Sequence, residues 1–194
     1  MESFVLFFIV TLIILTIMNH VKKNKKITYK VSSIDNRKYL VRKDTPDPQK
    51  SADKLAELNI IIQKIIKKAL ENKDHPTIER LHLYNPDTLS ESIPGETAFT
   101  SYSINKGEKI GICLLHPDFT FIDMNDIIFV TLHEISHILT IEEQHPPIFW
   151  KNFAFLIGVA EEIGLYKPID YSKDPKKYCG QSLTHSPYFD KKNN

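Results

Sequence analysis

The sequence predicts an α+β domain behind an apolar N-terminal helix, and three observations support this fold class. Apolar residues recur with helical spacing in the segments 51–71, 123–139 and 147–164. Short runs rich in β-branched and aromatic residues lie before and between these segments, as is typical of strands. The first 20 residues contain only one charged side chain, Glu2. We therefore expect a small, mostly antiparallel sheet with flanking helices.

Residues 1–21 are predicted to form a transmembrane anchor. The stretch Phe4–Met18 is apolar except for Thr11 and Thr16. A helix of this length rises about 22 Å, and the flanking residues bring it near the roughly 30 Å of a bilayer core. A cleavable signal peptide is the alternative. It is disfavoured because Glu2 replaces the usual basic start and no small-residue cleavage site follows.

A basic arm at residues 22–50 follows the predicted anchor. It contains two short strands, Ile27–Val31 and Lys38–Val41, and a linker at Asp44–Gln49. Segment 20–50 holds 10 Lys and Arg against 3 Asp and Glu, a net charge of +7. Under the positive-inside rule, this charge predicts a single-pass membrane protein whose C-terminal domain faces the cytoplasm.

The globular domain is predicted at residues 51–189, with a disordered tail at 190–194. Segment 51–194 holds 15 Lys and Arg against 20 Asp and Glu, a net charge of −5. A mildly acidic domain argues against nucleic acid as its direct partner.

The middle of the chain supplies a helix, a loop and a hairpin. The helix is Ser51–Glu71, and Asn85–Glu96 reads as a loop that borders a cleft. The strands Thr97–Ile104 and Lys109–Leu115 form a hairpin that turns at 105–107. One of its strands could hold an extended substrate by main-chain pairing.

The two cysteines, Cys113 and Cys179, leave a disulfide open. Cys113 lies in an apolar run and is predicted to be buried in a strand. Two cysteines without a secretory framework favour a reducing compartment.

The most informative motif is His133-Glu134-Ile135-Ser136-His137. Its spacing places two imidazoles one turn apart on one face of the predicted helix. Two neutral imidazoles so placed can share one Zn²⁺, and Glu134 can reach a water on the metal as general base. Asp123 or Asn125 can cap this helix.

A third zinc ligand is needed for a catalytic site with an open fourth position. His145 lies in a loop just ahead of the next helix, because Pro146 and Pro147 end helical continuation. The alternatives are Glu161 and Glu162 on that next helix, which would give a His₂Glu site. We favour His145, since a loop between two packed helices can present it directly to the metal.

These residues resemble the WLM and SprT-like zinc metallopeptidases. The shared features are His-Glu-x-x-His, a third His in a short loop, and the aromatic pair Phe149-Trp150. Looser similarity over 39–42, 102–109 and 164–180 looks like WLM-like proteins of large DNA viruses, so a virion interior is a second possible location. The spacing of eight from His137 to the third His excludes a metzincin.

The resemblance implies a zincin-like fold, Zn²⁺ as cofactor, and hydrolysis of peptide bonds in a protein or peptide substrate. It also implies His133, His137 and His145 as ligands and Glu134 as general base. The oxyanion partner stays open among four downstream residues: Tyr166, Tyr171, Tyr178 and His185.

A non-enzymatic, membrane-tethered scaffold with a structural zinc is the alternative function. Structural zinc usually has four protein ligands, so a fourth ligand such as Cys179 or His185 would favour it.

Overall fold

The structure is a computed structural model that describes residues 2–93, 95 and 100–190. Its helices are α1 (Glu2–Lys26), α2 (Pro48–Ala69), α3 (Met124–Leu139), α4 (Pro147–Glu162) and α5 (Pro187–Asp190), with 3-10 helices η1 (Ile78–Leu83) and η2 (Pro86–Thr88). Its strands are β1 (Ile27–Val31), β2 (Lys38–Arg42), β3 (Leu89–Glu91), β4 (Tyr102–Ile104), β5 (Lys109–Ile112), β6 (Lys176–Tyr178) and β7 (Gln181–Leu183).

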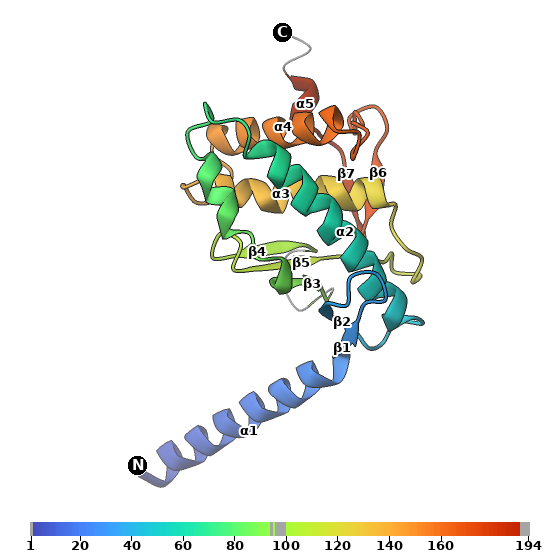
Figure 1. The fold of residues 1–194 in the computed structure, drawn as a ribbon. Coiled ribbons are helices and arrows are strands. Elements are labelled where there is room, and N and C mark those ends of the chain that lie inside the picture. Colours follow the sequence, from blue (N-terminus) through green and yellow to red (C-terminus); the bar gives the residue numbers. More distant parts are fainter. Residues whose placement is uncertain (1, 94, 96–99, 191–194) are drawn as a thin grey trace.

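The domain is layered, with α2 and α3 packed on a five-stranded sheet and α4 packed against both helices (Figure 1). This arrangement confirms the predicted α+β class. The boundaries that we predict for the anchor, arm and domain stay predictions. Residues 97–99 of the predicted hairpin and 191–194 of the predicted tail lie outside the described residues.

Helix α1 extends away from the layered part of the molecule (Figure 1). The sequence correctly predicts a helix here, and Phe4 to Val10 expose apolar side chains along it. Within the described residues, however, no helix is both long and apolar enough to cross a membrane. The predicted transmembrane anchor is therefore not supported.

The main sheet is mixed rather than mostly antiparallel, in the order β1-β2-β3-β5-β4. Strand β2 pairs antiparallel with β1, β5 pairs antiparallel with β4, and β3 pairs parallel with both β2 and β5. The prediction was wrong because β3 lies inside the segment predicted as a loop. Its three residues, Leu89-Ser90-Glu91, follow Pro86 and show no apolar alternation.

Helix α2 begins three residues earlier than predicted, at Pro48. The Asp47 carboxylate accepts the backbone N–H of Lys50, and proline suits the first helical position. The apolar stripe of α2, including Leu55, Ile62 and Ile65, is fully buried in the core. The helix thus packs on strands β1, β2 and β3 of the sheet and also contacts α3.

A second hairpin, β6–β7, forms a separate two-stranded sheet near the C-terminus. Its turn contains Cys179 and Gly180, both with positive φ. Nothing in the sequence pattern marks these three-residue strands, whose residues are mostly polar.

Cys113 and Cys179 form a disulfide, the pairing that the sequence leaves open. Cys113 is buried, as predicted, but lies just after β5 rather than within it. The fold brings the two Cα atoms to 6.2 Å across 66 residues of sequence, within the usual range for a disulfide. Composition could not anticipate this pairing, because it depends on where the β6–β7 hairpin docks.

The carboxylate of Glu91 is buried at the end of β3, with 4% of the residue exposed. It accepts the backbone N–H of Arg42 at 2.9 Å. Burial outweighs this bond and raises the pKa of Glu91 to about 7 from 4.5. The folded state therefore binds this proton more tightly than the unfolded chain does.

We expect the Glu91→Gln variant to remove a pH-dependent loss of stability. The contribution of Glu91 is fully present below pH 4.5 and is lost as the pH rises through about 7, a change of up to about 3 kcal/mol. The measurement is urea unfolding of both proteins from pH 4 to 8. The control is Asp74→Asn, at an exposed position, for which the free energy of unfolding should change with pH as it does in the wild type. If the free energy of unfolding of Glu91→Gln also changed with pH as in the wild type, the prediction would be contradicted.

Candidate metal centre and catalytic cleft

Helix α3 carries the first part of the site. The Asp123 carboxylate caps it by accepting the backbone N–H of Asn125, which decides between the two predicted caps. His133 and His137 lie one turn apart, with ring centroids 5.2 Å apart. Glu134 lies beside them and is buried, with 6% of the residue exposed. The predicted helix therefore forms, and it places His133, Glu134 and His137 beside one another.

The loop between α3 and α4 brings His145 onto the same site. Its Nε2 lies 3.0 Å from the Nε2 of His133, and its ring centroid lies 4.9 Å from those of both other histidines. The donor atoms of His133, His137 and His145 all lie within 4.8 Å of one another. The structure thus brings together the three residues predicted as ligands.

Phe149 forms the apolar support of the three imidazoles. Its fully buried ring lies 4.8, 4.6 and 4.5 Å from the ring centroids of His133, His137 and His145. Trp150 adds a second contact, 5.7 Å from His145. Because α4 starts immediately after the His145 loop, its first turn packs under all three histidines.

Two side chains, those of Asn152 and Lys106, hold the first residues of the loop that carries His145. The Asn152 side-chain amide donates to the Thr140 hydroxyl at 2.9 Å and joins α4 to the end of α3. Lys106, in the turn between β4 and β5, donates to the Glu142 carbonyl at 2.8 Å and pairs with Glu143 at 3.4 Å. The sequence analysis did not predict that Lys106 would hold this loop, because Lys106 and Glu142 are 36 residues apart in the sequence.

The site is electrostatically suited to a cation held by neutral nitrogen donors. Burial lowers the pKa of His133 to about 3 and that of His137 to about 4, and it also lowers the pKa of His145. Imidazoles with such pKa values are neutral at pH 7, which is the form that binds zinc. Burial raises the pKa of Glu134 to about 8. A nearby divalent cation would favour its ionised form.

The donor set fits zinc. Zn–N bonds of about 2.0–2.1 Å require donor nitrogens within roughly 4.2 Å of one another. The 3.0 Å between the Nε2 atoms of His133 and His145 meets this requirement. All donor atoms of the group lie within 4.8 Å of one another, so only small side-chain movements are needed to bring the remaining nitrogens into bonding distance of one ion. Three imidazoles with no fourth protein donor in the group leave a position for water, as in catalytic zinc sites.

The alternative ligands lie elsewhere. Glu161 accepts a hydrogen bond from the Tyr188 hydroxyl, and Glu162 pairs with Lys68 at 3.2 Å, so neither carboxylate joins the histidine group. Cys179 is in the disulfide, and His185 lies 3.1 Å from the carboxylate of Asp190. The described residues thus provide no fourth protein ligand that would indicate a structural zinc.

Of the four residues considered as oxyanion partners, only Tyr178 lines the cavity that also contains His133, His137 and His145. Its hydroxyl donates to the Cys113 carbonyl at 3.0 Å and lies 2.9 Å from the Ser101 hydroxyl. The Tyr171 hydroxyl donates to Asp126, and Tyr166 packs in the core against Phe129.

A cavity of about 710 Å³ opens over the histidine group. Its sides are lined by residues 100–103, the turn at 105–106, Tyr178 and residues 181–183. Helix α3 forms the floor, including His133, Glu134 and His137. The site therefore lies in a cleft between a sheet edge and the β6–β7 hairpin.

The fold and the site together define a metallopeptidase-like protein of the zinc-associated His-Glu-x-x-His type. The WLM domain profile matches residues 34–193, most of the chain. The chain belongs to the WLM family, as the sequence resemblance predicted.

Relatives and solved structures agree with this assignment. An uncharacterised protein of Acanthamoeba polyphaga mimivirus is 33% identical over 168 residues, covering 82% of this chain and 83% of the relative. An uncharacterised protein of Invertebrate iridescent virus 6 is 29% identical over 161 residues, covering 78% and 87%. The fold is similar to that in a crystal structure of Wss1 from Saccharomyces cerevisiae, with a TM-score of 0.50, 22% identity, and coverage of 64% of this chain and 90% of the solved Wss1 chain. A mutant of Wss1 gives the same score.

Replacement of His145 tests its position as third ligand. We expect His145→Ala to weaken zinc binding more than about 100-fold, because only two donors remain. Glu161→Ala, on the helix that the rival ligand set would use, should bind zinc like wild type. Competition with a chromophoric chelator measures both constants; a loss confined to Glu161→Ala would show that the ligand set is His₂Glu.

Replacement of Lys106 tests how the loop is held. We expect Lys106→Met to weaken zinc binding about 10-fold, since the loop carrying His145 loses its contact to the β4–β5 turn. Lys151→Met, at an exposed position on α4, is the matched control. Unchanged zinc affinity in Lys106→Met would mean that the loop holds its conformation without this contact.

Proposed function

We propose that this protein is a zinc-dependent peptidase. The observation that carries the proposal is the convergence of three neutral imidazoles beside a buried carboxylate on the floor of one open cleft. His133, His137 and His145 would hold the ion, and Glu134 would be the general base. Membership of the WLM family supports the same chemistry.

The mechanism assigns a separate role to each group. When bound, zinc would lower the pKa of a water molecule towards about 7 and polarise the substrate carbonyl. Glu134 would accept a proton from the attacking water and deliver it to the leaving amine. Phe149 and the Lys106 contact would keep the histidines in place during this step. Because Glu134 is buried, its proton transfer takes place largely shielded from solvent.

The cleft suits an extended protein or peptide segment. Strand β4 lies at the edge of the main sheet, and its ladder partner among the described residues is β5. A peptide lying along this edge could add main-chain hydrogen bonds and present its carbonyl to the site. Such pairing requires an unfolded segment rather than a folded loop.

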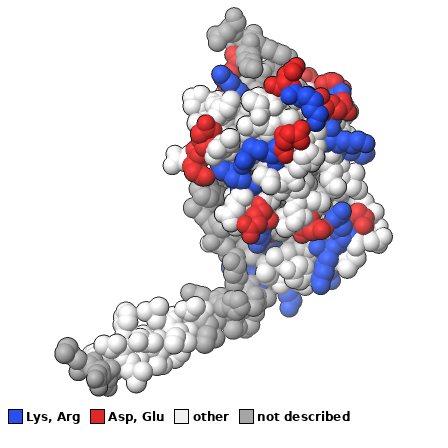
Figure 2. All heavy atoms as spheres, turned by 60° about the vertical axis from the view of Figure 1, so that its left-hand side comes forward, with Lys and Arg blue, Asp and Glu red and all other residues white. Residues whose placement is uncertain are grey.

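Nucleic acid is not proposed as a direct partner. On the face shown in Figure 2, acidic and basic side chains are interspersed rather than gathered into a basic patch. The net charge of −5 over residues 51–194 also argues against nucleic acid as a direct partner. The predicted location, with the domain facing the cytoplasm or a virion interior, stays a prediction from the sequence.

Replacement of Glu134 tests the proposed function. We expect Glu134→Gln to bind one zinc ion per chain but to lose peptide hydrolysis by at least about 100-fold, because the amide cannot accept the proton. Zinc content is measured by elemental analysis, and hydrolysis by mass spectrometry of a mixed peptide library. Glu161→Gln is the control and should keep full activity. Equal turnover by Glu134→Gln and wild type would exclude Glu134 as the base.

A further inference from the structure

The β6–β7 hairpin forms one wall of the cleft but is not part of the main sheet. Tyr178 and residues 181–183 line the cavity, as does the segment 100–103. Within the described residues, β6 and β7 pair only with each other. Among the described residues, no strand pairing therefore fixes the β6–β7 hairpin relative to β4. The position of the hairpin depends on side-chain contacts instead.

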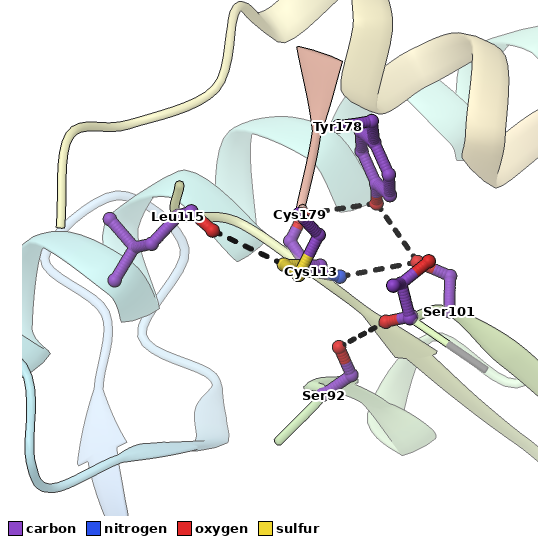
Figure 3. The surroundings of a disulfide bond; sticks show 7 residues. Ser92, Ser101, Cys113, Leu115, Tyr178 and Cys179 are labelled. Carbon is purple, nitrogen blue, oxygen red and sulfur yellow. Dashed lines mark hydrogen bonds between the residues drawn. A yellow bond between two sulfur atoms is a disulfide. The ribbon is translucent and has the colours of Figure 1, made fainter. Parts of the chain in front are cut away.

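The side-chain connections converge on Cys113, at the end of β5 (Figure 3). Cys179, in the turn of the hairpin, is joined to it by the disulfide. The neighbouring Tyr178 hydroxyl donates to the Cys113 carbonyl, and the Ser101 hydroxyl accepts the Cys113 N–H at 3.3 Å. Ser101 lies just before β4 and Tyr178 at the end of β6; both line the cavity, and their hydroxyls are 2.9 Å apart. This group thus joins the β4 side of the cleft to the β6–β7 hairpin at one point.

The disulfide is the only covalent member of this group. Hydrogen bonds between neutral groups contribute modestly to stability, and short hairpins without a sheet behind them open readily. Loss of the covalent bond should therefore raise the frequency of local opening of residues 176–183. Helix α3 has its own packing against α2, α4 and the sheet, so the histidine group should stay intact.

We infer that the Cys113–Cys179 disulfide positions the second wall of the cleft, so that peptide binding depends on the oxidised bond. This inference rests on the proposed peptidase function and adds redox control of substrate binding to it. Cys113 and Cys179 act here as positioning residues, since neither belongs to the histidine group.

The reducing step is ordinary thiol–disulfide exchange with a dithiol. A thiolate of the reductant attacks the sulfur of Cys179, the more exposed partner at 9% against 1% for Cys113. The S–S bond breaks, Cys113 leaves as a thiolate and takes up a proton, and a mixed disulfide forms on Cys179. The second thiol of the reductant then displaces Cys179 as a thiol. The dithiol becomes a disulfide and has supplied two electrons and two protons.

The test compares the oxidised and reduced forms of the zinc-loaded full chain. The reductant is a phosphine, which avoids the chelation of zinc by dithiols. We expect reduction to raise KM for a peptide substrate by roughly 10-fold with kcat within about 2-fold, because only substrate binding is affected. Hydrogen exchange of residues 176–183 should rise, while zinc content and the exchange of α3 stay unchanged.

Two variants serve as controls. The double variant Cys113→Ser/Cys179→Ser should behave like the reduced wild type and should not respond to the reductant. Ser101→Ala keeps the disulfide and removes the two hydrogen bonds of the Ser101 hydroxyl, to Tyr178 and to the Cys113 N–H. Its hairpin should therefore exchange more slowly than that of the reduced protein.

The outcomes separate this inference from the proposed function. Unchanged exchange of residues 176–183 on reduction would overturn the inference even if the oxidised protein hydrolyses no peptide. Loss of zinc or of α3 protection on reduction would also overturn it, because the disulfide would then support the whole domain. An inactive oxidised protein whose hairpin still opens on reduction would count against the peptidase, while the positioning of the wall would stand.

Discussion

The burial of helix α3 is the constraint on which the rest of the structure depends. Its apolar residues, among them Ile127, Leu132 and Ile135, are fully buried. Its buried hydroxyl groups bond within the helix, as Thr131 does to the Ile127 carbonyl and Ser136 to the Leu132 carbonyl. No polar partner is then required from outside the helix at these positions, so α2, α4 and the sheet can pack closely around it.

This packing fixes the direction of the side chains that form the candidate site. The turn between β4 and β5 approaches α3 so closely that a Cβ on Gly107 would lie 2.6 Å from Cδ1 of Ile138. Gly107 also has a φ of +101°, which other residues rarely adopt. The turn can therefore rest on the helix and extend Lys106 to the His145 loop. The third histidine is thus held by the same core that holds the first two.

Much of the site follows from the sequence, because its signals are local. The spacing of His133 and His137 identifies one helix face, and the prolines after His145 place it in a loop between helices. The elements that the sequence analysis missed lack such signals. Strands β3, β6 and β7 have three residues each, too few for periodicity to appear. The disulfide and the Lys106 contact join residues 66 and 36 positions apart, so they exist only after folding.

X-ray absorption at the zinc edge tests the central claim most directly, since it reports the atoms bound to the metal. The account predicts one zinc per chain with three imidazole nitrogens at about 2.0–2.1 Å and one oxygen from solvent. A sulfur ligand, a shell of four protein ligands, or failure of the folded protein to bind stoichiometric zinc would contradict it.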